Sequence, residues 1–138
     1  MDDTLKAIGD NFRDEPYAKL FGIDLVELDY GFAQVKMQVS KDMMNLFGVA
    51  HGGAVFSLMD AAFELAANSY GTVAVALSMS VNYISPALVG NTFFAKAREV
   101  SRSSRISTYE LTVQNSEGGL VASCQAMAYR KKDKLPFL

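Results

Sequence analysis

Residues 52–69 read GGAVFSLMDAAFELAANS, and this stretch decides the fold. Its residues are mainly good helix formers, and most of them are apolar. The polar exceptions, spaced by three, four and four residues, are Ser57, Asp60, Glu64 and Asn68. At about 100° per residue they fall within an arc of about 80°, so the helix carries one narrow polar stripe. We therefore predict a helix that is surrounded by protein on nearly every side and is ended by Gly71.

The segments on both sides of this helix are typical of strands, apart from a helical entry over residues 1–20. Alternation between apolar and polar side chains is clearest in residues 32–39 and 73–83. The complete set of strand patterns covers residues 22–30, 32–39, 73–83, 91–101, 105–114 and 119–130. Parallel βαβ units would need more helices, so the sheet is expected to be mainly antiparallel. The prediction is an α+β hotdog fold, in which a curved sheet of five or six strands wraps one central helix.

The bulk composition fits a single domain over residues 1–138, in which residues 131–138 form a short basic tail. Half of the residues are apolar and the net charge is −2, which argues against disorder and against a nucleic-acid partner. The single cysteine, Cys124, excludes an intrachain disulfide and suits a reducing compartment. We find no signal-peptide pattern and no apolar run long enough to span a bilayer, so we expect a cytoplasmic protein without a membrane partner.

The start of the long helix carries the strongest chemical signal, in the segment Asn45-Leu46-Phe47-Gly48-Val49-Ala50-His51-Gly52-Gly53. The first amides of a helix lack intrahelical acceptors and carry partial positive charge. No Ser, Thr, Asp or Asn stands here to cap them, so we expect the Gly52 and Gly53 amides to be open. Such donors suit a carbonyl oxygen that becomes negative during nucleophilic attack. A tight turn from loop into helix, without chemistry, is the alternative.

Asp60 is the second unusual feature, because a carboxylate in the middle of a buried helix costs free energy unless it is paired, hydrated or used. It is a candidate nucleophile, or a candidate general base for water. Glu64 is the competing carboxylate, one turn further along the same stripe. For both residues the alternative is a solvated or salt-bridged surface.

These residues resemble a known family. The pattern Asn45-x-x-Gly48-x-x-His51-Gly52-Gly53 with Asp60, followed by residues 80–86 (SVNYISP), is similar to the PaaI-type hotdog thioesterases over about residues 17–129. The resemblance implies hydrolysis of aryl- or medium- to long-chain acyl-CoA thioesters without metal or organic cofactor, coenzyme A being part of the substrate. It implies that the Gly52 amide polarises the thioester carbonyl and that Asp60 attacks it or activates water. Asn45 and His51 then position and polarise the substrate.

One position departs from the family pattern. Some relatives carry a Ser or Thr that helps to hold the nucleophilic water where this chain has Ala76, and Ser78 is the available substitute. The remaining substrate-binding candidates are Gly53, Phe47, Glu64, Arg102, Arg105 and Lys131. The two arginines lie in a predicted hairpin turn and the lysine follows the last predicted strand. The resemblance implies that they meet the phosphates of coenzyme A, whereas solvated turns, and core packing for the phenylalanine, are the alternatives.

Other chemistries fit this sequence poorly. It has no Gly-x-Ser-x-Gly elbow and no Gly-rich phosphate loop, and one His and one Cys do not make a structural zinc site. A non-catalytic acyl-CoA binding or sensing module on the same fold is the alternative to an enzyme. A purely structural oligomer leaves the polar stripe in a buried helix unexplained.

The spacing along the helix also predicts a shared active site. Gly52 and Asp60 are eight residues apart, or about 12 Å of helix rise, whereas reacting atoms must approach to about 3–3.5 Å. If both residues act on one thioester, the second comes from another chain. We therefore predict a homodimer with two shared sites and antiparallel central helices. The sequence leaves open whether dimers pair into tetramers and which acyl group is preferred.

Overall fold

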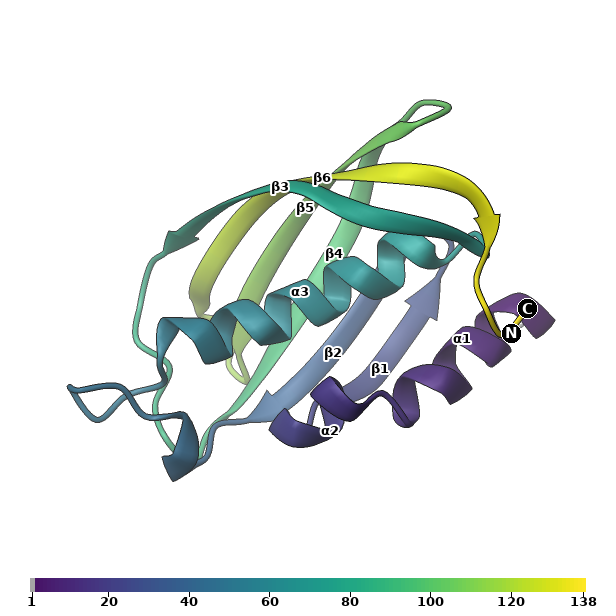
Figure 1. Cartoon of the computed structure of the whole chain (residues 1–138). Helices are drawn as coiled ribbons and strands as arrows, with labels where there is room; N and C mark the ends of the chain where they lie inside the picture. The colour runs from purple at the N-terminus through teal and green to yellow at the C-terminus, as the bar shows by residue number, and fades with distance from the viewer. Residues whose placement is uncertain (1) are drawn as a thin grey trace.

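The computed structural model describes residues 2–138 and confirms the hotdog arrangement (Figure 1). The central helix α3 (Gly52–Asn68) lies in the concave face of a six-stranded antiparallel sheet. The strands are β1 (Asp24–Asp29), β2 (Phe32–Gln38), β3 (Thr72–Tyr83), β4 (Thr92–Arg102), β5 (Ile106–Asn115) and β6 (Leu120–Lys134). Their order in the sheet is β1-β2-β4-β5-β6-β3, which leaves β1 and β3 at the two edges.

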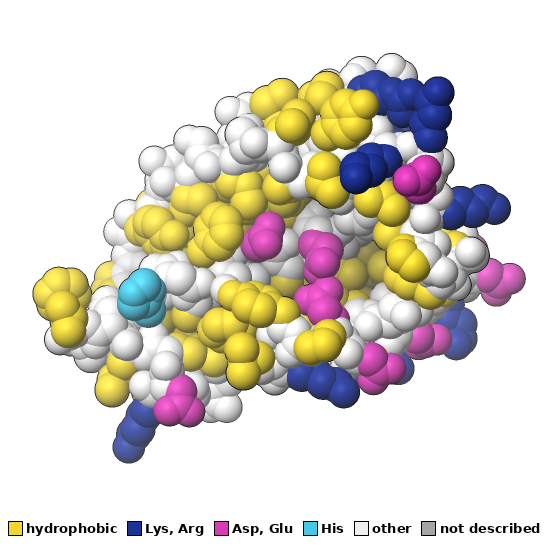
Figure 2. Space-filling view, in the orientation of Figure 1, with side chains coloured by type: hydrophobic (Ala, Val, Ile, Leu, Met, Phe, Trp, Pro, Cys, Tyr) yellow, Lys and Arg dark blue, Asp and Glu magenta, His cyan; other side chains and the backbone are white. Residues whose placement is uncertain are grey.

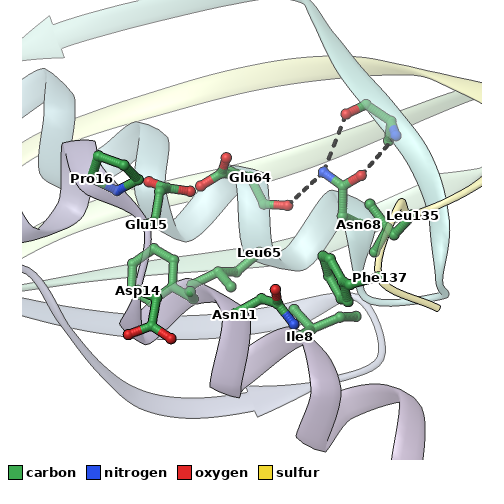
Figure 3. A pocket seen from close by; sticks show the side chains of 12 residues that line it. Ile8, Asn11, Asp14, Glu15, Pro16, Glu64, Leu65, Asn68, Leu135 and Phe137 are labelled. Carbon is green, nitrogen blue, oxygen red and sulfur yellow. Dashed lines mark hydrogen bonds between the residues drawn. The ribbon is translucent and has the colours of Figure 1, made fainter.

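The helical entry consists of two short helices, α1 (Asp3–Arg13) and α2 (Pro16–Phe21). Pro16 separates them because proline fits the first turn of a helix but cannot continue one. α1 packs against β1 and buries Ile8 and Phe12 on its inner face. Residues 14 and 15 form the connection between the two helices, which lies beside the second half of α3 (Figure 3).

The core forms where α3 meets the sheet. Leu58, Met59 and Ala62 of the helix are fully buried. The facing strands carry small residues at their inner positions, including Ala95 and Ala97 of β4, which let the helix lie close to the sheet. This packing positions α3, and therefore the polar stripe, against a rigid support. None of the helices in the described part of the chain combines the length and apolarity needed to cross a membrane.

The prediction of a basic tail after residue 130 is wrong. β6 continues to Lys134, whose partner across the ladder is Thr72 of β3. Lys131 therefore belongs to a strand. The long edge strand β3 offers unpaired backbone groups, and pairing with it extends β6 beyond the end of its apolar pattern.

The prediction of one uninterrupted alternation over residues 73–83 is also wrong, because a β-bulge lies between Ala76 and Ser78. Before the bulge, Ala76 pairs with the buried Ala128, so it faces α3. After the bulge, Ser78 pairs with the exposed Met127, so it faces outward. An extra residue in a strand reverses the direction of every side chain that follows.

Candidate active site

α3 begins at Gly52 with His51 as its N-cap. The Nδ1 atom of His51 accepts a hydrogen bond from the Gly53 amide at 2.8 Å. The expectation that both glycine amides are open is therefore wrong for Gly53: histidine replaces the usual capping side chain. The Gly52 amide has no acceptor within residues 2–138, so it is the free donor at this helix start.

The loop before α3 is built around Asn45. Its side-chain oxygen accepts hydrogen bonds from the backbone amides of Phe47 (2.8 Å) and Val49 (3.3 Å). The backbone amide of Asn45 donates to the Val49 carbonyl at 2.8 Å. The His51 amide closes the loop by donating to the Met43 carbonyl. Asn45 thus fixes the shape of the loop that presents His51 and Gly52. Phe47 is 85% exposed at the loop tip, so it lines neither a pocket nor the core of its own chain.

A hollow of about 380 Å³ opens beside the free amide, between the loop and the last residues of β3. Asn45, Gly52 and Tyr83 all line it. The Tyr83 hydroxyl donates to the Gly52 carbonyl at 3.3 Å, which holds the end of β3 against the helix start. Asn45 and Gly52 therefore line one hollow at the C-terminal end of β3, and His51, the N-cap of α3, lines a neighbouring one.

Asp60 lies half-buried in the middle of α3, where it lines two hollows of about 220 Å³ each. One is closed by residues 74–76 of the edge strand β3, and the other by Tyr17 and Glu15 from the N-terminal segment. The carboxylate makes no hydrogen bond or ion pair within residues 2–138. Burial, and then the nearby charge of Glu15, raises the pKa of Asp60 above its ordinary value.

Glu64 lies one turn further along α3 and faces Glu15 across the pocket drawn in Figure 3. Although part of its side chain reaches solvent, loss of hydration, the Glu15 carboxylate and Asp60 together raise the pKa of Glu64 to about 8. In Figure 2 the acidic side chains gather in the hollow at the centre of this face. The pKa values of Asp60 and Glu64 are thus both raised, and Asp60 remains the candidate base because it makes no hydrogen bond within residues 2–138, whereas Glu64 interacts with Glu15.

Glu15 is a member of this group that the sequence did not reveal. It is separated from Glu64 by 49 residues and belongs to no motif. No local signal identifies it, because its proximity to α3 results from the packing of α1 on the sheet.

The basic candidates for coenzyme A binding lie near the end of α3 that is opposite to Gly52. The Arg102 guanidinium lies 3.6 Å from the ring centre of Tyr70, which follows the C-terminus of α3, whereas Gly52 is at its N-terminus. Arg105 lies in the predicted hairpin turn between β4 and β5, and Lys131 is exposed on β6. These three side chains are thus not brought to the Gly52 amide of their own chain.

A buried arginine that the sequence did not single out holds the same hairpin. Arg130 donates to the carbonyls of Ser103 (2.8 Å) and Ser104 (3.2 Å) and to the Ser107 hydroxyl. Ser78, on the outer face after the bulge, does not line the hollow that holds Asp60 and Ala76 within the same chain.

One helix cradled in a curved antiparallel sheet, with a free amide at the helix start and a carboxylate at its middle, is the arrangement of hotdog thioester hydrolases. The chain belongs to the thioesterase superfamily, whose family model matches residues 47–122, more than half of its length. It is an enzyme of the thioester hydrolase class.

Individual relatives agree with this assignment. The chain is 34% identical to the Escherichia coli acyl-coenzyme A thioesterase PaaI over 86% of its own length and 85% of the relative. The structure of E. coli PaaI, from the phenylacetic acid degradation operon, superposes with a TM-score of 0.91 at 30% identity and covers 95% of both chains. A Streptococcus mutans protein solved with acetyl-CoA bound has a TM-score of 0.78 at 28% identity, over 82% of this chain and 91% of that one.

Proposed function

We propose that the protein hydrolyses acyl-CoA thioesters to the free acid and coenzyme A. The observation that carries the proposal is the pair of unused groups: a free amide at Gly52 and an unpaired, half-buried carboxylate at Asp60. The relatives support the coenzyme A part of the substrate, because one is named an acyl-CoA thioesterase and another was solved with acetyl-CoA. The residues present supply a complete route without metal or organic cofactor.

The reaction follows from what each group does. The thioester oxygen accepts a hydrogen bond from the Gly52 amide, whose partial positive charge at the helix start stabilises the oxyanion. Asp60 takes a proton from water as the water oxygen bonds to the carbonyl carbon. The tetrahedral intermediate collapses, the carbon–sulfur bond breaks, and the proton on Asp60 passes to the departing thiolate. Direct attack by Asp60 is the other route open to this carboxylate: the carbon–sulfur bond breaks, the coenzyme A thiolate leaves, and water then cleaves the anhydride formed with Asp60.

The Gly52 amide and the Asp60 carboxylate can act on the same thioester only if they come from two chains. β3 is an edge strand of 12 residues, and it exposes Val75 (41%) and Leu77 (54%). A long apolar edge of this kind is a template for pairing with another strand. We propose that β3 pairs with β3 of a second copy, which continues the sheet through both subunits.

A two-fold axis through the middle of β3 has a specific consequence. The free amide of Gly52 lies beside Tyr83, at the C-terminal end of β3, and Asp60 lies beside residues 74–76, near the N-terminal end. An antiparallel β3 pair brings the C-terminal end of one strand to the N-terminal end of the other. Each Gly52 amide therefore meets the Asp60 of its partner, and the dimer has two equivalent sites. A further pairing of dimers is compatible with this arrangement.

Within the same proposal, Arg102, Arg105 and Lys131 bind the phosphates of coenzyme A. Basic side chains gather at the corner of the molecule where the β4–β5 hairpin lies (Figure 2). Arg130 keeps that hairpin in one shape, so its turn is a preformed surface. Within one chain the β4–β5 hairpin and the Gly52 amide lie at opposite ends of α3. A coenzyme A whose thioester is bound by one Gly52 amide therefore meets the hairpin of the partner chain.

The test measures thiol release from short, medium, long and aryl acyl-CoAs with the parent, Asp60→Asn and Glu64→Gln. We expect Asp60→Asn to retain the fold and the oligomer but to lose about 10²-fold or more in kcat. Glu64→Gln, the matched control on the same helix face, should keep a kcat much closer to the parent value. A kcat for Asp60→Asn within a few-fold of the parent contradicts the mechanism. Binding of every acyl-CoA without thiol release identifies the non-catalytic module instead.

A further inference from the structure

An aromatic cluster beside the C-terminus of α3 has no role in the chemistry described above. Tyr70, shortly after the end of the helix, stacks on Tyr30 with the ring centres 5.5 Å apart. The Arg102 guanidinium, at the end of β4, lies over the same Tyr70 ring, 3.6 Å from its centre. A cation in this position is attracted by the negative charge of the ring face. The Tyr70 ring is therefore a platform for the arginine at the base of the β4–β5 hairpin.

The Tyr70 ring is fixed by its hydroxyl as well as by its face. That hydroxyl donates to Oε1 of Glu99 at 3.0 Å, and the hydroxyl of the fully buried Tyr109 donates to Oε2 of Glu99 at 3.1 Å. Burial, and then the hydrogen bond to Glu99, raise the pKa of Tyr70, so its hydroxyl keeps the proton that it donates. Glu99 thus links the Tyr70 ring to the core of the sheet.

The donors of Arg102 are left available by this arrangement. Each carboxylate oxygen of Glu99 already accepts a tyrosine hydroxyl, and Arg102 makes no ion pair within residues 2–138. Stacking uses the flat face of a guanidinium, whereas its N–H donors lie in its plane and point outward. A carboxylate partner would also hold the arginine, but it would occupy those donors. The ring therefore orients Arg102 and leaves its N–H groups open to an anion.

Arg102 differs in this respect from the other two basic candidates. Arg105 directs its guanidinium at the backbone carbonyl of Arg130, at 3.5 Å, which uses part of its donor set. Lys131 is exposed on β6, and a lysine ammonium is a point charge on a flexible stem, so it loses rotamer entropy when it binds an anion. An arginine that already stacks on a ring loses less, and such preorganisation raises affinity.

We propose that Tyr70 is a positioning residue for substrate binding, whose ring holds the Arg102 guanidinium ready to bind a phosphate group of coenzyme A. The proposal rests on the acyl-CoA hydrolysis proposed above and assigns a role to a residue outside the sequence motif. The alternative is that Arg102 only offsets the partial negative charge at the C-terminus of α3, which stabilises the fold without affecting the substrate. The two explanations differ in which substrates respond when the ring is removed.

The experiment measures KM and kcat for an acyl-CoA and for the acyl-pantetheine with the same acyl group, which has the thioester but no phosphate. Tyr70→Leu removes the ring, and Tyr70→Phe is the matched control that keeps the ring and loses only the bond to Glu99. We expect Tyr70→Leu to raise the KM for acyl-CoA by about 5-fold, the size of a partly exposed cation–π contact, with kcat near the parent value. The KM for acyl-pantetheine should not change, and Tyr70→Phe should stay close to the parent with both substrates.

A double-variant cycle tests whether Tyr70 acts through Arg102. Arg102→Ala should itself raise the KM for acyl-CoA, and adding Tyr70→Leu to it should cause no further rise, because the ring then has no arginine to position. An acyl-CoA that lacks the ribose 3′-phosphate identifies the group that is bound. If the effect of Tyr70→Leu disappears with this substrate, Arg102 binds the 3′-phosphate; if the effect persists, Arg102 binds the pyrophosphate.

The outcomes separate this inference from the proposed function. If Tyr70→Leu leaves the KM for acyl-CoA unchanged, or raises the KM for acyl-pantetheine equally, the inference is overturned while acyl-CoA hydrolysis stands. If the parent protein releases thiol from neither substrate, the proposed function has failed, and the inference fails with it. Should Tyr70→Leu not fold, Arg102→Lys at its exposed position keeps the charge but lacks the planar guanidinium. It should also raise the KM for acyl-CoA alone, and an unchanged KM contradicts the proposal.

Discussion

Mixing two inactive variants tests whether the active site is shared between chains. The variants are Gly52→Pro, which removes the amide hydrogen, and Asp60→Asn, which removes the base. Within one chain the two groups are about 12 Å apart along α3, and attack requires about 3–3.5 Å. Gly52→Pro therefore alters the start of α3 and Asp60→Asn its middle, and in the proposed dimer the Gly52 and Asp60 of one chain belong to different sites.

The structure accommodates Gly52→Pro. Gly52 is the first residue of α3, a position that proline favours, and its amide has no acceptor to lose. His51 has φ −59° and ψ 141°, a conformation that suits the residue before a proline. A Cβ atom at Gly52 lies 3.5 Å from the Tyr83 ring, an ordinary contact. Gly52→Ala is the matched control, because it adds the same Cβ atom and keeps the amide.

The expected magnitudes follow from these roles. Loss of one oxyanion donor lowers kcat by about 10²–10³-fold, and Gly52→Ala stays near the parent. In an equal mixture that exchanges freely, about half of the dimers are mixed. Each mixed dimer has one site with both lesions and one with neither, so about a quarter of the parental activity per site returns.

The assay follows thiol release from an acyl-CoA after the two variants have been refolded together, with exchange confirmed by mass spectrometry of differently tagged chains. Asp60→Asn mixed with Asp60→Ala is the control and should restore nothing. Activity equal to the sum of the separate variants, in a sample whose chains have demonstrably exchanged, refutes the shared site. It then places both groups of each site in one chain.

Three further predictions concern charge. Folding raises the pKa of Glu64 from its ordinary 4.5 to about 8, so the folded protein favours the protonated form. The melting temperature should therefore fall as the pH rises between these two values, and Glu64→Gln should flatten that profile. Arg130→Met removes the hydrogen bonds that hold the β4–β5 hairpin and should lower the free energy of unfolding by about 1–3 kcal/mol in denaturant titrations. Neutralising Arg102, Arg105 and Lys131 together should raise KM for acyl-CoA with little change in kcat, an effect that shrinks with added salt because exposed phosphate contacts are screened. An unchanged KM at low ionic strength means that these are solvated charges.

Much of the fold could be predicted because its signals are local. The period of polar residues in residues 52–69 determines which face of α3 is buried, and Pro16 separates two helices without reference to anything distant. The same locality placed Asn45, His51 and Gly52 in one loop and helix start. One helix among many strands was enough to exclude a parallel sheet, since parallel strands require crossover connections.

Other features depend on pairing between distant segments, and these could not be predicted. The bulge that turns Ser78 outward and the extension of β6 to Lys134 are set by how β3 and β6 align. A bulge involves one residue, and no apolar pattern marks it. The capping role of His51 likewise depends on the loop conformation that turns its ring toward Gly53.

The sequence by itself determined the elements, their order and the motif at the helix start, because helix period, strand alternation and turn residues act over a few neighbouring positions. Only the tertiary structure decided the electrostatic surroundings of the two carboxylates on α3. Burial and the charge of Glu15, which comes from a different helical segment, raise the pKa values of both Glu64 and Asp60. Electrostatic free energies depend on separation in space and on loss of water, and neither quantity is fixed until the chain has packed.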